Sequence, residues 1–158
     1  MNIKPILILR ALISCVGALD GCGSSGKPAF LIAQVCLRNA DDQAAFSHEM
    51  QVIAQSKGKQ LIDRSADTQK ELNDIGHPGE GARTRPVINM GILLGDGVGV
   101  TAGNLGMPGY QVAVGFSESS KPANAHRFAD AVVKRLAERW RVEPVPAGTG
   151  AKGMENCN

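Results

Sequence analysis

The chain has 158 residues, which is enough for one domain with a substantial core and too few for two stable ones. Hydrophobic residues make up 43% of it and charged residues 20%, a composition typical of globular rather than disordered proteins. The net charge of +2 and an aromatic content of 4% argue against nucleic-acid binding and against aromatic platforms that stack on bases or sugars. No apolar run reaches the roughly 18 to 20 residues that a membrane-spanning helix needs.

Residues 1–21 have the pattern of a signal peptide. Two basic residues precede or interrupt an apolar stretch, and small residues follow it. Cys22 comes directly after Gly21 and leads into a tether over 22–29 that is rich in Gly and Ser. This arrangement resembles the lipobox of bacterial lipoproteins, in which the cysteine is acylated and becomes the mature N-terminus. The resemblance implies a lipid anchor at Cys22.

Three alternatives to acylation of Cys22 stay open. Cys15 also follows a lipobox-like sequence, although that choice leaves Arg10 inside the apolar segment. A signal peptide without lipidation is the second alternative, and a buried N-terminal helix is the third. The helix is disfavoured because Arg10 and Asp20 bracket a segment that is apolar all round rather than on one face. With Cys22 acylated and Gly23 next to it, we expect the protein on the periplasmic face of the outer membrane.

The four cysteines support export. If Cys15 is cleaved off and Cys22 is acylated, Cys36 and Cys157 remain. Because two cysteines remain and the compartment is oxidising, we expect a disulfide between Cys36 and Cys157. The alternative is a buried free Cys36 and an exposed free Cys157.

The mature domain, residues 30–158, begins with a short apolar segment over 30–37 that predicts a buried strand. Asn39 has the chemistry of a helix N-cap, and Gly58 stands where a helix would end. Between them, apolar residues recur at helical spacing and predict an amphipathic helix whose buried stripe is Phe46, Met50, Ile53 and Ala54.

The middle of the chain is less regular. We expect a short strand over 59–63, a brief helix over 65–72, a loop over 76–85 and a strand over 87–94. Residues 95–109 contain six glycines and are interpreted as one long loop, which favours a functional role because loops of this length are uncommon without one.

The last third gives the clearest pattern. Residues 110–116 alternate as a strand does, and Pro122 opens an amphipathic helix. Residues 142–145 predict a final strand, which Pro144 and Pro146 mark as a sheet edge. The predicted buried stripe of the helix is Ala125, Phe128, Val132, Leu136 and Trp140.

This order of elements predicts an α+β two-layer sandwich, a ferredoxin-like antiparallel sheet with two helices on one face. In that arrangement the first and last strands are neighbours. A bond between Cys36 and a tail beyond the last strand is therefore geometrically plausible.

No catalytic or cofactor site emerges from the sequence. His48, His77 and His126 share no metal-ligand spacing. The sequence around Ser117 weakly resembles a nucleophile elbow. The aspartate and histidine that should follow such a serine occur in the wrong order, however. The glycine-rich stretch 95–109 lacks the lysine of a phosphate-binding loop. We therefore expect no enzyme activity, no cofactor and no metal.

Four segments carry a resemblance to a group of small exported lipoproteins encoded beside type VI secretion effectors: 62–72 (IDRSADTQKEL), 95–119 (GDGVGVTAGNLGMPGYQVAVGFSES), 125–140 (AHRFADAVVKRLAERW) and 145–157 (VPAGTGAKGMENC). Members of that group are thought to be immunity proteins that neutralise periplasm-acting toxins, lipases among them. The resemblance implies a protein partner of that kind, such as a phospholipase-type effector.

Together these observations predict a membrane-anchored periplasmic binding module. Two other functions stay open: an envelope hydrolase that uses Ser117, and a structural or assembly lipoprotein. We expect the glycine-rich stretch to supply the partner-binding surface, because its small residues allow close backbone approach. The alternative is that this stretch folds back as an extra hairpin that only covers the sheet. The residues predicted to bind the partner are Asp96, Asn104, Leu105, Met107 and Tyr110.

Overall fold

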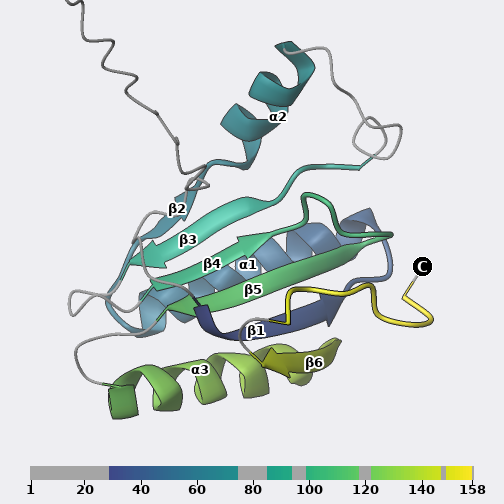
Figure 1. Ribbon diagram of the computed structural model, residues 1–158. Helices are drawn as coiled ribbons and strands as arrows, with labels where there is room; N and C mark the ends of the chain where they lie inside the picture. The colour runs from purple at the N-terminus through teal and green to yellow at the C-terminus, as the bar shows by residue number, and fades with distance from the viewer. Residues whose placement is uncertain (1–28, 75–84, 94–98, 118–121, 147–148, 158) are drawn as a thin grey trace, which may run out of the picture.

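A computed structural model describes residues 29–74, 85–93, 99–117, 122–146 and 149–157. The predicted signal peptide, Cys15, Cys22, most of the tether and most of the predicted loop over 76–85 lie outside the described residues. The helices and strands of the described part are shown in Figure 1. In chain order they are β1 (Ala29–Cys36), α1 (Ala40–Ser56), β2 (Leu61–Asp63), α2 (Ser65–Asp74), β3 (Asn89–Leu93), β4 (Gly99–Gly103), β5 (Gln111–Ser117), α3 (Pro122–Ala137) and β6 (Arg141–Pro146).

The strands form one antiparallel sheet in the order β2-β3-β4-β5-β1-β6. Strands β4, β5, β1 and β6, with α1 and α3 on one face, have the arrangement of a ferredoxin-like fold, so the predicted two-layer α+β sandwich is confirmed. Strands β2 and β3 extend the sheet beyond β4. Helix α2 has no buried residue and projects past that edge (Figure 1).

Alternation along the strands places the hydrophobic core between the sheet and the two helices α1 and α3. Ala33 and Val35 of β1 are fully buried, and so are their partners on β5, Val114 and Val112. The residues between them point to the opposite side, which we call the helix-free face. The predicted stripes of both helices are confirmed as part of this core, since their buried members are Phe46, Met50, Ile53 and Ala54 of α1 and Ala125, Phe128, Val132 and Leu136 of α3, with Trp140 just beyond α3.

Helix α1 begins and ends at the residues that the sequence indicates. The Oδ1 atom of Asn39 accepts a hydrogen bond from the backbone N–H of Asp42 at 2.9 Å, which is the predicted N-cap. Gly58 follows the end of the helix with a φ of 62°, a conformation that favours glycine. The chain can therefore reverse into β2 without strain.

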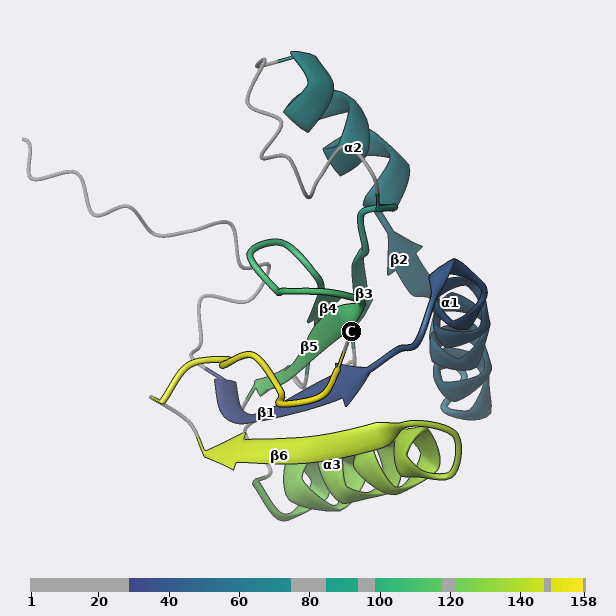
Figure 2. The same ribbon diagram turned by 90° about the vertical axis from the view of Figure 1, so that its right-hand side faces the viewer.

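The C-terminal tail, residues 149–157, crosses the sheet on the side away from α1 (Figure 2). The predicted disulfide between Cys36 and Cys157 is confirmed, with the two Cα atoms 5.6 Å apart and 121 positions of separation in sequence. Cys36 is the last residue of β1, and its partner across β6 is Arg141. The Arg141 guanidinium donates a hydrogen bond to the backbone carbonyl of Glu155, which holds the tail at a second point. The edge position predicted for β6 is also confirmed.

The interpretation of residues 95–109 as one long loop is wrong for its central part. Gly99–Gly103 form β4, which pairs with β3 on one side and β5 on the other. Val100 and Ala102 are buried toward the helices and Thr101 is exposed on the helix-free face, so the segment alternates as a strand does. Backbone pairing on both sides outweighs the weak strand preference of its glycines.

Candidate functional site

Small residues cover the centre of the helix-free face. In register across the sheet, Gly91 of β3, Thr101 of β4 and Gly115 of β5 stand side by side on it. A Cβ atom on Gly115 would lie 3.2 Å from the Thr101 Oγ1 atom, a tight approach that leaves little room for a side chain between the strands. Glycine therefore fits at position 115, where a larger residue would crowd the Thr101 side chain.

Three exposed hydrophobic side chains border this flat area, and we call them the sheet patch: Ile62, Leu93 and Leu105. Ile62 is 42% exposed and pairs with Gly91, so it emerges on the helix-free face. Leu93 is 47% exposed and follows the buried Ile92, which gives it the same orientation. Leu105 is 52% exposed and belongs to the β4–β5 loop, which projects on the side away from α1 (Figure 2). They are the large hydrophobic residues that the described part of the chain exposes most.

The predicted partner-binding residues fall into different environments. The Asn104 side chain joins the β4–β5 loop to the segment before β3: its Oδ1 atom accepts from the Ile88 N–H at 2.8 Å, and its Nδ2 atom donates to the Pro86 carbonyl at 2.9 Å. Met107 is only 8% exposed, and Tyr110 is half-buried against the core. Asp96 lies outside the described residues. Of this set, Leu105 offers the most exposed apolar surface.

Ile62 and Leu93 were not among the residues predicted to bind a partner. The sequence hardly indicates that these two residues are exposed. Each has an apolar neighbour in the chain, so the alternation of apolar and polar residues that marks the two faces of a strand is not visible. Only the register of β2 against β3 shows which of each apolar pair faces the helices. Because the sequence alone does not show that register, it does not reveal the sheet patch.

The C-terminal tail covers one end of the helix-free face. Gln111 is 1% exposed, and its Oε1 atom accepts a hydrogen bond from the Met154 N–H at 2.8 Å. Its Nε2 atom donates to the carbonyls of Met154 and Cys157, both at 3.3 Å. A Cβ atom on Gly153 would lie 3.0 Å from the ring of Pro108, so the tail also packs closely on the β4–β5 loop. Tail and loop thus form one continuous edge beside the open area.

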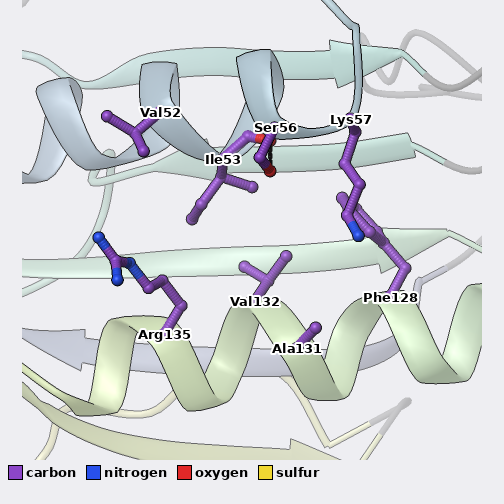
Figure 3. Close-up of a pocket in the computed structure, with 8 residues that line it drawn as sticks. All are labelled: Val52, Ile53, Ser56, Lys57, Phe128, Ala131, Val132 and Arg135. Atoms are coloured by element: carbon purple, nitrogen blue, oxygen red, sulfur yellow. Dashed lines mark hydrogen bonds between the residues drawn. The ribbon is translucent and has the colours of Figure 1, made fainter.

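A second surface feature lies on the opposite side of the sheet, in the groove between α1 and α3 (Figure 3). It has a volume of about 360 Å³, and its lining is mainly apolar, with one cation directly after α1 and one on α3. The lining residues are Val52, Ile53, Ser56, Lys57, Phe128, Ala131, Val132 and Arg135.

The electrostatics of this groove centre on a buried carboxylate. The Glu49 side chain is only 4% exposed, and its Oε1 atom accepts from the Arg135 Nε atom at 2.6 Å. Arg139 approaches the Oε2 atom at 3.4 Å, and Glu138 pairs with Arg135 at 3.3 Å. The hydrogen bond and charge of Glu49 raise the pKa of Arg135, so this guanidinium stays charged. The ion pairs also join α1 to α3 across the groove.

Ser117 and two of the three histidines lie in the described part of the chain. Ser117 is buried at the end of β5, and a Cβ atom on Gly99 would lie 3.8 Å from its Oγ atom. The His126 ring packs on Phe30, with 4.3 Å between ring centroids, and His48 is exposed on α1. His77 lies outside the described residues. Within the described ranges, no cluster of His, Cys, Asp or Glu could hold a metal ion.

Comparison with protein-family models finds no match for this chain, and comparison with curated proteins finds none either. Of the helices that the structure describes, none is both long and apolar enough to cross a membrane.

Proposed function

We propose that this protein is an exported, lipid-anchored binding module that occludes a secreted enzyme and thereby protects the cell envelope. Cys22 carries the anchor in this proposal, on the periplasmic face of the outer membrane, and the partner is a toxin such as a phospholipase-type effector. The Cys36–Cys157 disulfide supports export, because structural disulfides persist in oxidising compartments.

The sheet patch is the observation that carries the proposal. Isolated exposed hydrophobic residues are common, but Ile62, Leu93 and Leu105 border one flat, glycine-rich area on the same side of the molecule. The three side chains can act as apolar anchors for a partner beside the small residues Gly91, Thr101 and Gly115. Helices α1 and α3 bury their apolar stripes on the opposite face, so neither of these two helices covers this side of the sheet.

The resemblance implies that a secreted enzyme is encoded beside this protein's gene, and the experiment measures binding to such a neighbouring enzyme, with substitutions in the sheet patch. We expect Ile62→Asp, Leu93→Asp and Leu105→Asp each to weaken the complex, at least one of them by about 1–2 kcal/mol, because each replaces an apolar contact of the proposed interface by a charge. Since all three side chains are exposed, the melting temperature should hardly change. Titration calorimetry and thermal unfolding measure the two effects separately.

Ala44→Asp is the matched control, because Ala44 is exposed on α1, away from the helix-free face. It should leave the affinity unchanged. If none of the sheet-patch variants weakens the complex while Ala44→Asp does, the partner binds the helical side and the proposed surface is wrong. If the neighbouring enzyme forms no complex at all, the proposed function itself is contradicted.

A further inference from the structure

Helix α2 lies at a sheet edge although it adds nothing to the hydrophobic core. None of its residues is buried. A helix of ten residues is only marginally stable in water by itself, so contacts with the rest of the chain hold it in place. In the described part of the chain these contacts are polar, and they converge on residues 87–89, where β3 begins. This arrangement indicates that α2 serves the edge of the sheet rather than its core.

Strand β2 leaves this part of the edge unpaired, because it pairs only with residues 90–92 of β3. The backbone of Ile88 points to the other side, where its N–H donates to the Asn104 Oδ1 atom at 2.8 Å and its carbonyl accepts from the Asn104 N–H at 3.3 Å. Backbone groups alternate in direction along an extended segment. Those of Val87 and Asn89 therefore point outward, to the side on which a further strand would pair.

Residues at the start of α2 bind these outward groups in place of a strand. The Ser65 Oγ atom accepts a hydrogen bond from the Asn89 N–H at 3.0 Å, and the Arg64 N–H donates to the Asn89 carbonyl at 2.8 Å. The Gln69 Oε1 atom accepts from the Val87 N–H at 3.3 Å. The backbone groups that a further strand would use are therefore already partnered, and α2 itself extends beyond this edge (Figure 1).

The sequence of this segment shows why its edge needs a cover. Residues 87–93 (VINMGIL) contain no charged residue and no proline, and three of the seven are β-branched. Uncharged segments of this length with high strand propensity pair readily with copies of themselves when their edge is exposed. The outer strand at the other end of the sheet, β6, contains Pro144 and Pro146, which have no N–H to donate. The edge at 87–89 has no proline and has α2 instead.

We propose that α2 is an edge cover, an autoinhibitory contact in which Ser65 and Gln69 prevent copies of this chain from pairing through residues 87–89. The occupant that the edge cover excludes is a second copy, because every copy carries the same outward N–H and carbonyl groups and two identical segments can pair antiparallel. Polar contacts alone hold the described part of the edge cover, so it opens at a lower cost than the core does. The inference does not depend on the proposed function.

The test compares two double variants of the full chain with the disulfide intact. Ser65→Ala with Gln69→Ala removes two side-chain acceptors of the edge cover, and alanine preserves the helix itself. Lys70→Ala with Glu71→Ala is the matched control, because both side chains are exposed on α2 and the net charge stays the same. Size-exclusion chromatography with light scattering gives the molar mass over a range of protein concentrations, and hydrogen exchange followed by NMR gives the protection of single amides.

We expect the molar mass of the Ser65→Ala, Gln69→Ala variant to rise with concentration, whereas the control should behave as the unsubstituted chain does. In dilute solution the Val87 and Asn89 amides of this variant should exchange at least about tenfold faster than in the unsubstituted chain, because their acceptors are gone. In concentrated solution they should become protected again. Adding Asn89→Lys should restore the original mass, because a charge on an edge strand opposes pairing with a second copy.

Three results would overturn the proposal. The first is a molar mass that stays at the value of the unsubstituted chain at every concentration, which would leave Ser65 and Gln69 a purely structural role. The second is self-association that protects a different segment or that Asn89→Lys does not reverse, which would assign the association to unfolding or to another surface. The third is equal self-association of the Lys70→Ala, Glu71→Ala control.

Discussion

Gln111 shows how a single polar side chain can organise a buried region. It stands on the helix-free face of a central strand, where the tail covers it, and its amide makes three hydrogen bonds to backbone atoms of the tail. Each of these bonds gives a partner to a backbone N–H or carbonyl group of the tail that the fold shields from water. The tail therefore has a specific register on the sheet in addition to its covalent link.

Gln111→Leu should lower the free energy of unfolding by about 1–3 kcal/mol, because it leaves the Met154 N–H buried without its partner. Urea unfolding of the oxidised protein measures this loss. Gln55→Leu, at an exposed position of α1, is the control and should change stability by less than about 0.5 kcal/mol. Equal stability of the two variants would show that the tail bonds contribute nothing.

Asp42 gives the N-terminus of α1 a pH dependence. The Arg38 side chain donates to its carboxylate at 2.8 Å, and this bond lowers the pKa of Asp42 from 3.8 to about 2. A carboxyl group with a lowered pKa in the folded state stabilises the protein above its unfolded pKa and loses that contribution as the pH falls through the folded pKa. The contribution of Asp42 is therefore complete above about pH 4 and disappears toward pH 2.

Asp42→Asn should lower the melting temperature at pH 6 and leave it nearly unchanged at pH 2, where the native carboxyl group is also neutral. The difference between the two proteins should shrink between pH 4 and pH 2. Differential scanning calorimetry across this range measures it. A difference that stays constant down to pH 2 would show that the effect comes from the geometry of the N-cap rather than from the charge.

At the scale of elements, the disulfide turns the tail into part of the sheet. Cys36 ends β1, and the tail that Cys157 anchors covers Gln111 and contacts the loop between β4 and β5. The covalent link removes conformational freedom from the unfolded chain, since it closes a loop of more than a hundred residues.

Reduction of the disulfide, or the double substitution Cys36→Ala and Cys157→Ala, should lower the free energy of unfolding by about 2–4 kcal/mol. The tail should then become accessible to protease ahead of the rest of the domain. Limited proteolysis with and without reductant, read by mass spectrometry, tests both parts. Reductant must have no effect on the double variant. Unchanged cleavage of the tail after reduction would show that Gln111 and Arg141 hold it without the covalent bond.

Strand β4 marks the limit of prediction from local sequence. The amphipathic stripes of α1 and α3 and the strands at 30–37 and 110–116 have strong periodicity and were predicted with nearly correct bounds. In β4, glycines stand at both ends and only Val100 gives a strong apolar signal, so the segment has the composition of a loop. It becomes a strand because β3 and β5 provide backbone partners on both sides, which no local pattern shows.

At the scale of the whole molecule, the ferredoxin-like arrangement follows from the order of elements, whereas the candidate surface does not. The number and faces of the helices could be predicted, and so could the neighbouring positions of the first and last strands and the disulfide that they permit. The sheet patch required the register of β2 against β3, which brings Ile62 beside Gly91. Surface sites assembled from several strands depend on such tertiary pairing.

The two sides of the sheet differ in chemistry. The helix-free face exposes the hydrophobic side chains of Ile62, Leu93 and Leu105, whereas the groove between α1 and α3 has a mainly apolar lining together with Lys57 and Arg135. They lie on opposite sides of one sheet.

In the proposed function, the chain protects the envelope by binding a secreted enzyme through the sheet patch. The most direct test of this proposal is growth of cells that export the enzyme of the neighbouring gene into the periplasm, with either the intact chain or the combined variant Ile62→Asp, Leu93→Asp and Leu105→Asp, at equal amounts of folded protein. We predict that the intact chain restores growth and that the combined variant does not. Equal protection by both proteins would contradict the assigned surface, and no protection by either would contradict the proposed function.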